Sequence, residues 1–221
     1  MPDPVESPSP ITRVFLLDDH EDVRRGVAAV LDTEPDLKVV GEAGTAAEAL
    51  LSVPALVPDV AVLDVRLPDG DGVTVCRELR SRVPHVHCML LTSISDEHAL
   101  LAASLAGADA YQLKQIRATA LIETIRAVAA GLSRLDQQLR TAAVERALSA
   151  LSEADPARRL SGQEHTALAL IVEGRTNRDL GERMRLPEAA VRELVSQLLV
   201  KIDLQRYIGD AAVVGNRPGG G

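Results

Sequence analysis

Five polar residues in the first half of the sequence have the chemistry of a phosphoryl-transfer site: Asp18, Asp19, Asp64, Thr92 and Lys114. Each lies at the end of a short apolar run. Because open parallel sheets bind ligands beyond the carboxyl ends of their strands, we expect these side chains to share one edge. Clustered carboxylates repel one another unless a cation lies among them, which favours a hard divalent ion such as Mg²⁺. A metal ion and an ammonium group would neutralise a phosphoryl group while a carboxylate oxygen attacks phosphorus.

The elements that would position these residues alternate along the sequence. Short apolar, β-branched runs predict strands at 13–17, 37–41, 59–65, 87–93 and 110–114. The stretches between and after them predict helices at 21–31, 45–53, 72–82, 96–107 and 119–131, the last ending at Gly131. This alternation is typical of a parallel sheet with helices on both faces. We therefore predict an α/β flavodoxin-like doubly wound domain over 12–131.

The second half of the sequence has no strand pattern. An amphipathic helix is predicted at 135–151 and a polar segment follows to residue 159, so 132–159 is interpreted as a linker. Further helices are predicted at 162–174, 177–185, 187–202 and 210–214. Ser161 and Glu164 form a capping box before the first of these. We expect a small all-α domain over 160–214 and a disordered tail over 215–221.

Charge and composition limit the classes of function. The 221 residues carry a net charge of -8, which argues against a simple polyanion-binding protein, because phosphate affinity comes from Lys and Arg. From residue 157 onward there are 10 Lys and Arg against 8 Asp and Glu, so the acid is concentrated in the first domain. Without a signal peptide or a long apolar span, the protein is expected to be cytoplasmic. Cys76 and Cys88 are interpreted as buried, reduced thiols, with redox sensing as the alternative.

Four motifs of the first domain resemble the receiver domain of two-component response regulators. They are VFLLDDHEDVRRGV, VLDVRLPDGDG, LLTS and GADAYQLK, and the likeness covers residues 12–131. The resemblance implies that Asp64 accepts a phosphoryl group from a histidine kinase. It also implies that the chain is not an enzyme, apart from slow autodephosphorylation.

The same resemblance implies a role for each residue of the site. The Mg²⁺ ligands would be the side chains of Asp18, Asp19 and Asp64 and the backbone carbonyl of Arg66. Thr92 and Lys114 would bind the phosphoryl group. Tyr111 would rearrange with Thr92 on activation, although ordinary packing at the sheet edge explains this residue nearly as well. An aspartyl phosphatase of the haloacid dehalogenase type is disfavoured, because such enzymes need a second Asp where Arg66 stands.

Helices 177–185 and 187–202 resemble the helix-turn-helix of LuxR-type DNA-binding domains, whose second helix enters the major groove. The two halves together resemble the NarL/FixJ family of response regulators, and DevR/DosR-like regulators in particular. This implies a homodimer that binds promoter DNA after phosphorylation. An apolar stripe of Val191, Leu194, Val195, Leu198 and Ile202 should face the other helices. The residues expected to face DNA are Ala189, Arg192, Glu193, Ser196, Arg175, Arg178 and Lys201.

The recognition helix departs from the family pattern at three positions. DevR-like proteins carry Lys and Asn where Ala189 and Glu193 stand, and the family usually has Thr where Ala190 stands. Glu193 could accept a hydrogen bond from a cytosine amino group, but it would also repel phosphates. Weakened or redirected DNA binding is therefore the main hypothesis. The alternative is a receiver-driven interaction protein whose helical domain has lost DNA binding.

Overall fold

The computed structural model describes residues 11–93, 103, 105–133, 135, 160–173 and 175–201, with the backbone alone at 196 and 199–201. Only residues 103, 105–107 and 135 of the predicted helices 96–107 and 135–151 belong to this part of the chain. Of the rest of the linker only residues 132 and 133 belong to it, and the helix 210–214 and the tail lie outside it. Outside it too are Ile202 and the side chains of Ser196 and Lys201.

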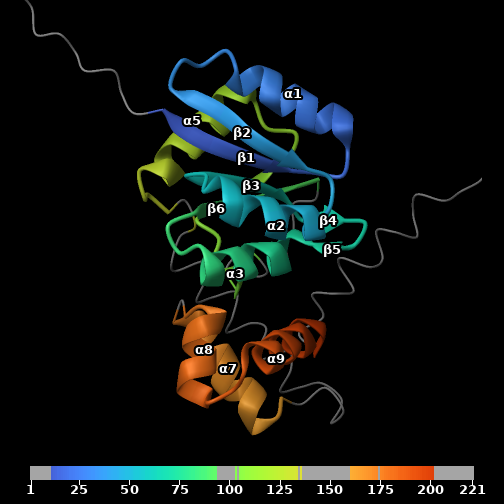
Figure 1. Ribbon diagram of the computed structural model, residues 1–221, viewed down its shortest axis with the longest axis vertical. Coiled ribbons are helices and arrows are strands. Elements are labelled where there is room, and N and C mark those ends of the chain that lie inside the picture. Colours follow the sequence, from blue (N-terminus) through green and yellow to red (C-terminus); the bar gives the residue numbers. More distant parts are fainter. Residues whose placement is uncertain are drawn as a thin grey trace, which may run out of the picture.

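A five-stranded parallel sheet forms the centre of the first domain (Figure 1). Its strands are β1 (Thr12–Leu17), β2 (Leu37–Ala43), β3 (Val60–Asp64), β6 (His87–Thr92) and β7 (Ala110–Leu113). They pair in the order β2-β1-β3-β6-β7, which reverses direction at β1. The predicted flavodoxin-like fold is thereby confirmed, and the switch point of the strand order lies beside the ends of β1 and β3.

Among the elements that the structure describes, helices cover both faces of the sheet (Figure 1). They are α1 (Glu21–Leu31) and α5 (Ala118–Ala129) on one face, and α2 (Ala46–Leu56) and α3 (Gly72–Arg82) on the other. Successive strand residues alternate between the two cores because side chains of a strand point to opposite faces. Phe15 and Leu63 belong to the core under α2 and α3, whereas Val14 and Val62 belong to the core under α1 and α5.

The structure confirms the predicted end of one helix and corrects the predicted end of another. Gly131 has a φ of 75°, and Leu132 N–H donates to Ala127 O, so Gly131 ends α5 as predicted. In α2 the predicted end at Val53 was wrong, because the helix continues through Pro54 to Leu56. Proline removes only one hydrogen bond, and the next turn resumes where Val57 N–H donates to Val53 O at 2.9 Å.

A short antiparallel hairpin follows β3 directly, made of β4 (Arg66–Leu67) and β5 (Gly70–Asp71). The sequence analysis predicted no paired strands between the strand at 59–65 and the helix at 72–82. The hairpin leads straight into α3, so that α3 begins beside the end of β3.

The second domain contains α7 (Gly162–Val172), α8 (Asn177–Met184) and α9 (Glu188–Lys201), which lie next to α3 (Figure 1). The capping box of Ser161 and Glu164 is confirmed. Val191, Leu194, Val195 and Leu198 are all buried, which confirms the described part of the predicted stripe of α9. None of the described helices is long and apolar enough to cross a membrane.

Candidate functional site

The five residues predicted to form a site meet at the carboxyl edge of the sheet. Asp64 and Thr92 are the last residues of β3 and β6, while Asp18 and Lys114 follow β1 and β7. Asp18, Asp64 and Thr92 are each about 95% buried or more. Asp19, the fifth residue, is more exposed. The strand order places these ends side by side, as the switch-point rule predicts.

The ammonium group of Lys114 contacts two carboxylates of the site. Its Nζ atom donates to Asp64 Oδ2 at 2.7 Å and lies 2.6 Å from Asp18 Oδ2. Lys114 N–H also donates to Thr92 O at 2.7 Å, which fixes the start of its loop to the end of β6. One ammonium therefore faces two buried acids.

The pocket shifts the ionisation of its two central groups. Burial raises the pKa of Asp64, although the hydrogen bond from Lys114 and the amide of Arg66 oppose this shift. Burial alone would lower the pKa of Lys114, but its bonds to Asp18 and Asp64 outweigh burial and raise it. The ammonium is thus held in its charged form, whereas the Asp64 carboxylate gains stability from any further cation that approaches it.

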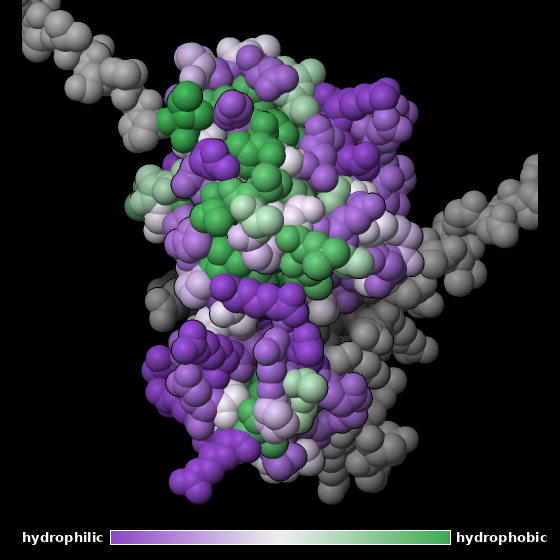
Figure 2. Space-filling view, in the orientation of Figure 1, coloured by the Kyte–Doolittle hydropathy of each residue, from purple (hydrophilic) through white to green (hydrophobic). Residues whose placement is uncertain are grey.

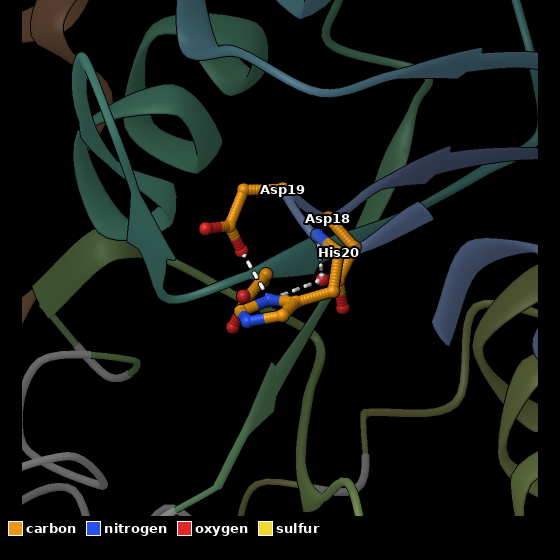
Figure 3. A group of neighbouring side chains, drawn as sticks. Asp18, Asp19 and His20 are labelled. Atoms are coloured by element: carbon orange, nitrogen blue, oxygen red, sulfur yellow. Dashed lines mark hydrogen bonds and ion pairs between the residues drawn. The ribbon is translucent and has the colours of Figure 1, made fainter. Parts of the chain in front are cut away.

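Four side chains offer ligand atoms that all lie within 4.8 Å of one another: Asp18, Asp19, His20 and Asp64. Three carboxylates fit the hard ion Mg²⁺, which prefers oxygen ligands. His20 was not among the predicted ligands. It follows the acid pair directly, which was the only signal in the sequence. Figure 3 shows its ring next to the carboxylates of Asp18 and Asp19.

Arg24, which the sequence analysis did not single out, holds the loop that carries the acid pair. Its Nη1 atom donates to the backbone oxygen of Asp18 at 2.6 Å, and its Nε atom lies 3.4 Å from Glu42 Oε2. The side chain is only 17% exposed. A buried guanidinium on α1 thereby connects the end of β1 to β2.

The hairpin β4–β5 encloses the other side of Asp64. The amide of Arg66 donates to the Asp64 carboxylate, which lowers the pKa of that group. The role predicted for the carbonyl of Arg66 stays a prediction. A Cβ atom on Gly72 would lie 2.0 Å from the backbone oxygen of Asp64, so only glycine allows α3 to start this close to β3.

Neighbouring polar residues have structural roles. Asp69 accepts hydrogen bonds from Ala46 N–H and Ala47 N–H at the start of α2. Asp71 accepts from Thr74 N–H at 2.7 Å and caps α3. Tyr111 is partly buried and packs against the core under α2 and α3. Its packing is compatible with both interpretations made from the sequence.

The exposed face of α9 carries Ala189, Arg192 and Glu193, as the helical spacing predicted. Each predicted cation with a described side chain lies near an acid. Arg178 Nε donates to Glu182 Oε1 at 3.3 Å, Arg175 Nε lies 3.5 Å from Glu173 Oε2, and Arg192 Nη1 lies 3.7 Å from Glu188 Oε1. Such exposed pairs are weak and give way easily to a phosphate.

The helical domain contacts α3 through polar groups. Asn177 N–H donates to Ser81 Oγ at 3.0 Å, and Arg77 Nη2 donates to Arg175 O at 3.4 Å. Arg192 Nε of α9 lies 3.8 Å from Glu78 Oε1, and Glu78 is only 3% exposed. Burial lowers the pKa of Arg77 to about 10. The sequence analysis missed this surface because the polar residues of an amphipathic helix normally face solvent.

A cavity of about 330 Å³ lies between α3 and the helical domain, lined among others by Glu78, Ser81, Asn177 and Leu186. Polar side chains surround the junction on the face drawn in Figure 2. Arg77 Nε, Glu78 Oε1 and Asn177 Oδ1 are buried and find no hydrogen-bond partner in the described part of the chain.

Comparisons with known proteins agree with this arrangement. The family described as "Response regulator receiver domain" matches residues 14–126. The DNA-binding transcriptional activator DevR/DosR of Mycobacterium tuberculosis is 47% identical over 89% of this chain and 90% of its own. The transcriptional regulatory protein LiaR of Bacillus subtilis is 32% identical over 87% and 91%.

A solved structure extends the likeness to the fold. The signal receiver domain of the response regulator NarL of Mycobacterium tuberculosis is 32% identical, with a TM-score of 0.54. The match covers 56% of this chain and 99% of that one. The chain therefore belongs to the family of response regulators with a receiver domain.

Proposed function

We propose that Asp64 receives a phosphoryl group from a histidine kinase, and that α8 and α9 then bind promoter DNA as part of a homodimer. One observation carries the proposal: Lys114 Nζ lies 2.7 Å from Asp64 Oδ2 and 2.6 Å from Asp18 Oδ2. In the transfer, a carboxylate oxygen of Asp64 bonds to phosphorus while the bond from phosphorus to the kinase histidine breaks. The ammonium of Lys114 lies where it can neutralise the new charge, and Thr92 ends the neighbouring strand.

Mg²⁺ is the cofactor that fits the acids of this pocket. Asp18, Asp19 and Asp64 supply carboxylate oxygens, and the backbone carbonyl of Arg66 would add a fourth ligand. The bound ion supplies charge neutralisation of the phosphoryl oxygens. Because Arg66 stands where an aspartyl phosphatase needs its second acid, we expect slow autodephosphorylation and no turnover of a substrate.

DNA binding is supported by the exposed Arg192 on α9 and by the relatives named as DNA-binding or transcriptional regulators. The docking of α8 and α9 on α3 suggests how binding is controlled. The hairpin that contacts Asp64 leads into Gly72, where α3 begins, and α3 carries Glu78 and Ser81. We infer that added charge at Asp64 displaces α3 and frees Arg192 for phosphate contacts.

The second candidate function is a regulator that binds a partner protein through its helical domain. The exposed acid Glu193 favours it, because Gln197 Nε2 donates to Glu193 Oε1 at 2.6 Å and holds the carboxylate on the surface that DNA would approach. Such a carboxylate repels the phosphate backbone.

One experiment separates these functions. Wild type, Asp64→Asn and the control Asp22→Asn, an exposed acid of α1, are treated with acetyl phosphate and Mg²⁺. A labile phosphoryl adduct is expected on wild type and Asp22→Asn but not on Asp64→Asn; an adduct on all three would overturn the assignment of Asp64. Genomic footprinting then follows. Phosphorylation-dependent protection supports the DNA-binding function, whereas phosphorylation without protected DNA supports the partner-binding one.

A further inference from the structure

The ring of His20 lies against both members of the acid pair. Its Nδ1 atom lies 2.6 Å from Asp19 Oδ1 and 3.5 Å from Asp18 Oδ1 (Figure 3). The backbone N–H of His20 donates to the same Asp18 oxygen at 3.0 Å. The side chain is 68% exposed, so its contacts with the acid pair, and not packing into the core, hold its position.

The distances allow a nitrogen of His20 to join the carboxylates around one ion. Metal–ligand bonds of about 2.1 Å place ligand atoms at most about 4.2 Å apart. The ligand atoms of Asp18, Asp19, His20 and Asp64 already lie within 4.8 Å of one another. A small inward movement therefore completes a set of three oxygens and one nitrogen.

The two oxygens of Asp18 face different partners. Oδ2 contacts the ammonium of Lys114 at 2.6 Å, while Oδ1 lies on the side of His20. An ion held by Asp18 Oδ1 and His20 would thus leave the contact between Lys114 and Asp18 in place. Carboxylates alone suit Mg²⁺, but an imidazole ligand adds affinity for transition metals and very little for Mg²⁺.

We propose that His20 is a direct nitrogen ligand of the metal site beside Asp64, which raises the affinity of this site for a divalent first-row transition metal and leaves its affinity for Mg²⁺ unchanged. The inference deepens the proposed function and rests on its acidic metal site. His20 thereby selects the metal, whereas Asp64 receives the phosphoryl group in either metal-loaded form.

The test uses the full chain with Mn²⁺ and Mg²⁺ as probes. Affinities are measured by titration calorimetry for wild type, His20→Gln and the control His85→Gln, which removes an exposed histidine before β6. Loss of a ligand should weaken Mn²⁺ binding about tenfold or more in His20→Gln, with Mg²⁺ binding unchanged. Pulsed electron paramagnetic resonance of the Mn²⁺ form should detect coupling to a ligand nitrogen in wild type and His85→Gln, and none in His20→Gln.

Two results would overturn the inference: an equal ratio of Mn²⁺ to Mg²⁺ affinity in wild type and His20→Gln, or a nitrogen coupling that survives in His20→Gln. Labelling with acetyl phosphate in Mg²⁺ separates this failure from failure of the proposed function. If His20→Gln is labelled like wild type but lacks the metal effects, only the role of His20 is wrong. If wild type itself is not labelled, the role of Asp64 is wrong, and the metal measurements still decide the role of His20.

Discussion

Arg192 Nε on the exposed face of α9 lies 3.8 Å from Glu78 Oε1 on α3, so a predicted DNA contact lies against the domain that carries the phosphoryl acceptor. Glu78 is 3% exposed and also contacts Arg82 Nη2 at 3.2 Å, whereas the Arg192 side chain is 45% exposed. The pair therefore immobilises an arginine that is otherwise available to solvent and to phosphates.

Replacing Glu78 by Gln should release α9 from α3. Arg192 loses its buried charge partner, so the unphosphorylated protein should bind DNA more tightly, by roughly fivefold. Hydrogen exchange of the α8 amides should also speed up, because Asn177 and its neighbours lose part of their contact surface. The control is Glu123→Gln, an exposed acid of α5. Unchanged exchange and unchanged DNA affinity in Glu78→Gln would show that this contact does not hold the helical domain.

Gly72→Ala should destabilise the first domain. The new Cβ atom would meet the backbone oxygen of Asp64 at 2.0 Å, so α3 or β3 must shift, at a cost of about 1–3 kcal/mol or more. Labelling of Asp64 by acetyl phosphate should fall with it. Gly26→Ala is the matched control, because nothing lies within 4 Å of a Cβ atom there and alanine stabilises an exposed helix by about 0.5–1 kcal/mol. Calorimetric melting temperatures should therefore move in opposite directions; a parallel shift would contradict the close packing at Gly72.

The edge of the sheet was predictable, whereas the surface of α3 was not. Asp18, Asp64 and Lys114 end or follow strands whose order is set by alternating strands and helices, so their meeting point follows from topology alone. Glu78 and Ser81 belong to the polar face of an amphipathic helix, and the sequence of that face does not indicate which element packs on it. Their burial depends on the approach of α8 and α9, which involves residues nearly a hundred positions away.

Local chemistry explains the smaller differences. The role of Arg24 depends on which way a long side chain turns, and a motif does not encode that direction. The helix predicted to end at Val53 continues through Pro54, because proline does not end a helix when the next turn is supported by buried neighbours such as Val53.

Asp64→Asn should change how stability depends on pH. Burial holds the pKa of Asp64 above its ordinary value of 3.8, so the folded state binds a proton more tightly than the unfolded state. This group therefore contributes stability at pH values below 3.8 and loses it as the pH rises through its folded pKa. Asparagine does not titrate, so the stability of Asp64→Asn relative to wild type should increase from about pH 3 to pH 7. Urea midpoints at several pH values test this, with Asp22→Asn as the reference; a difference that stays constant or shrinks would contradict the raised pKa.

Arg24→Met should weaken metal binding without touching a ligand. The guanidinium fixes the backbone oxygen of Asp18 at 2.6 Å, so its loss lets the acid pair move, and Mg²⁺ affinity should fall about tenfold. Arg25→Met is the control on the next position, where the side chain is 72% exposed and pairs only with Glu21 among the described residues. Calorimetry of both variants tests the role. Equal losses of Mg²⁺ affinity in the two variants would mean that Arg24 acts through its charge and not by fixing the loop that carries Asp18.

Glu193→Asn should show whether Glu193 of α9 repels DNA phosphates or recognises a base. The carboxylate is exposed and held by Gln197, so its removal should strengthen binding to any DNA if it repels phosphates, by roughly fivefold at low salt. If Glu193 instead accepts a hydrogen bond from cytosine, the variant should lose affinity for footprinted sites while its binding to unrelated DNA stays the same. Glu123→Gln, which removes an exposed acid of α5, controls for the change in net charge. Affinities on both kinds of DNA across a salt series separate the two effects, because repulsion fades with salt and a missing base contact does not.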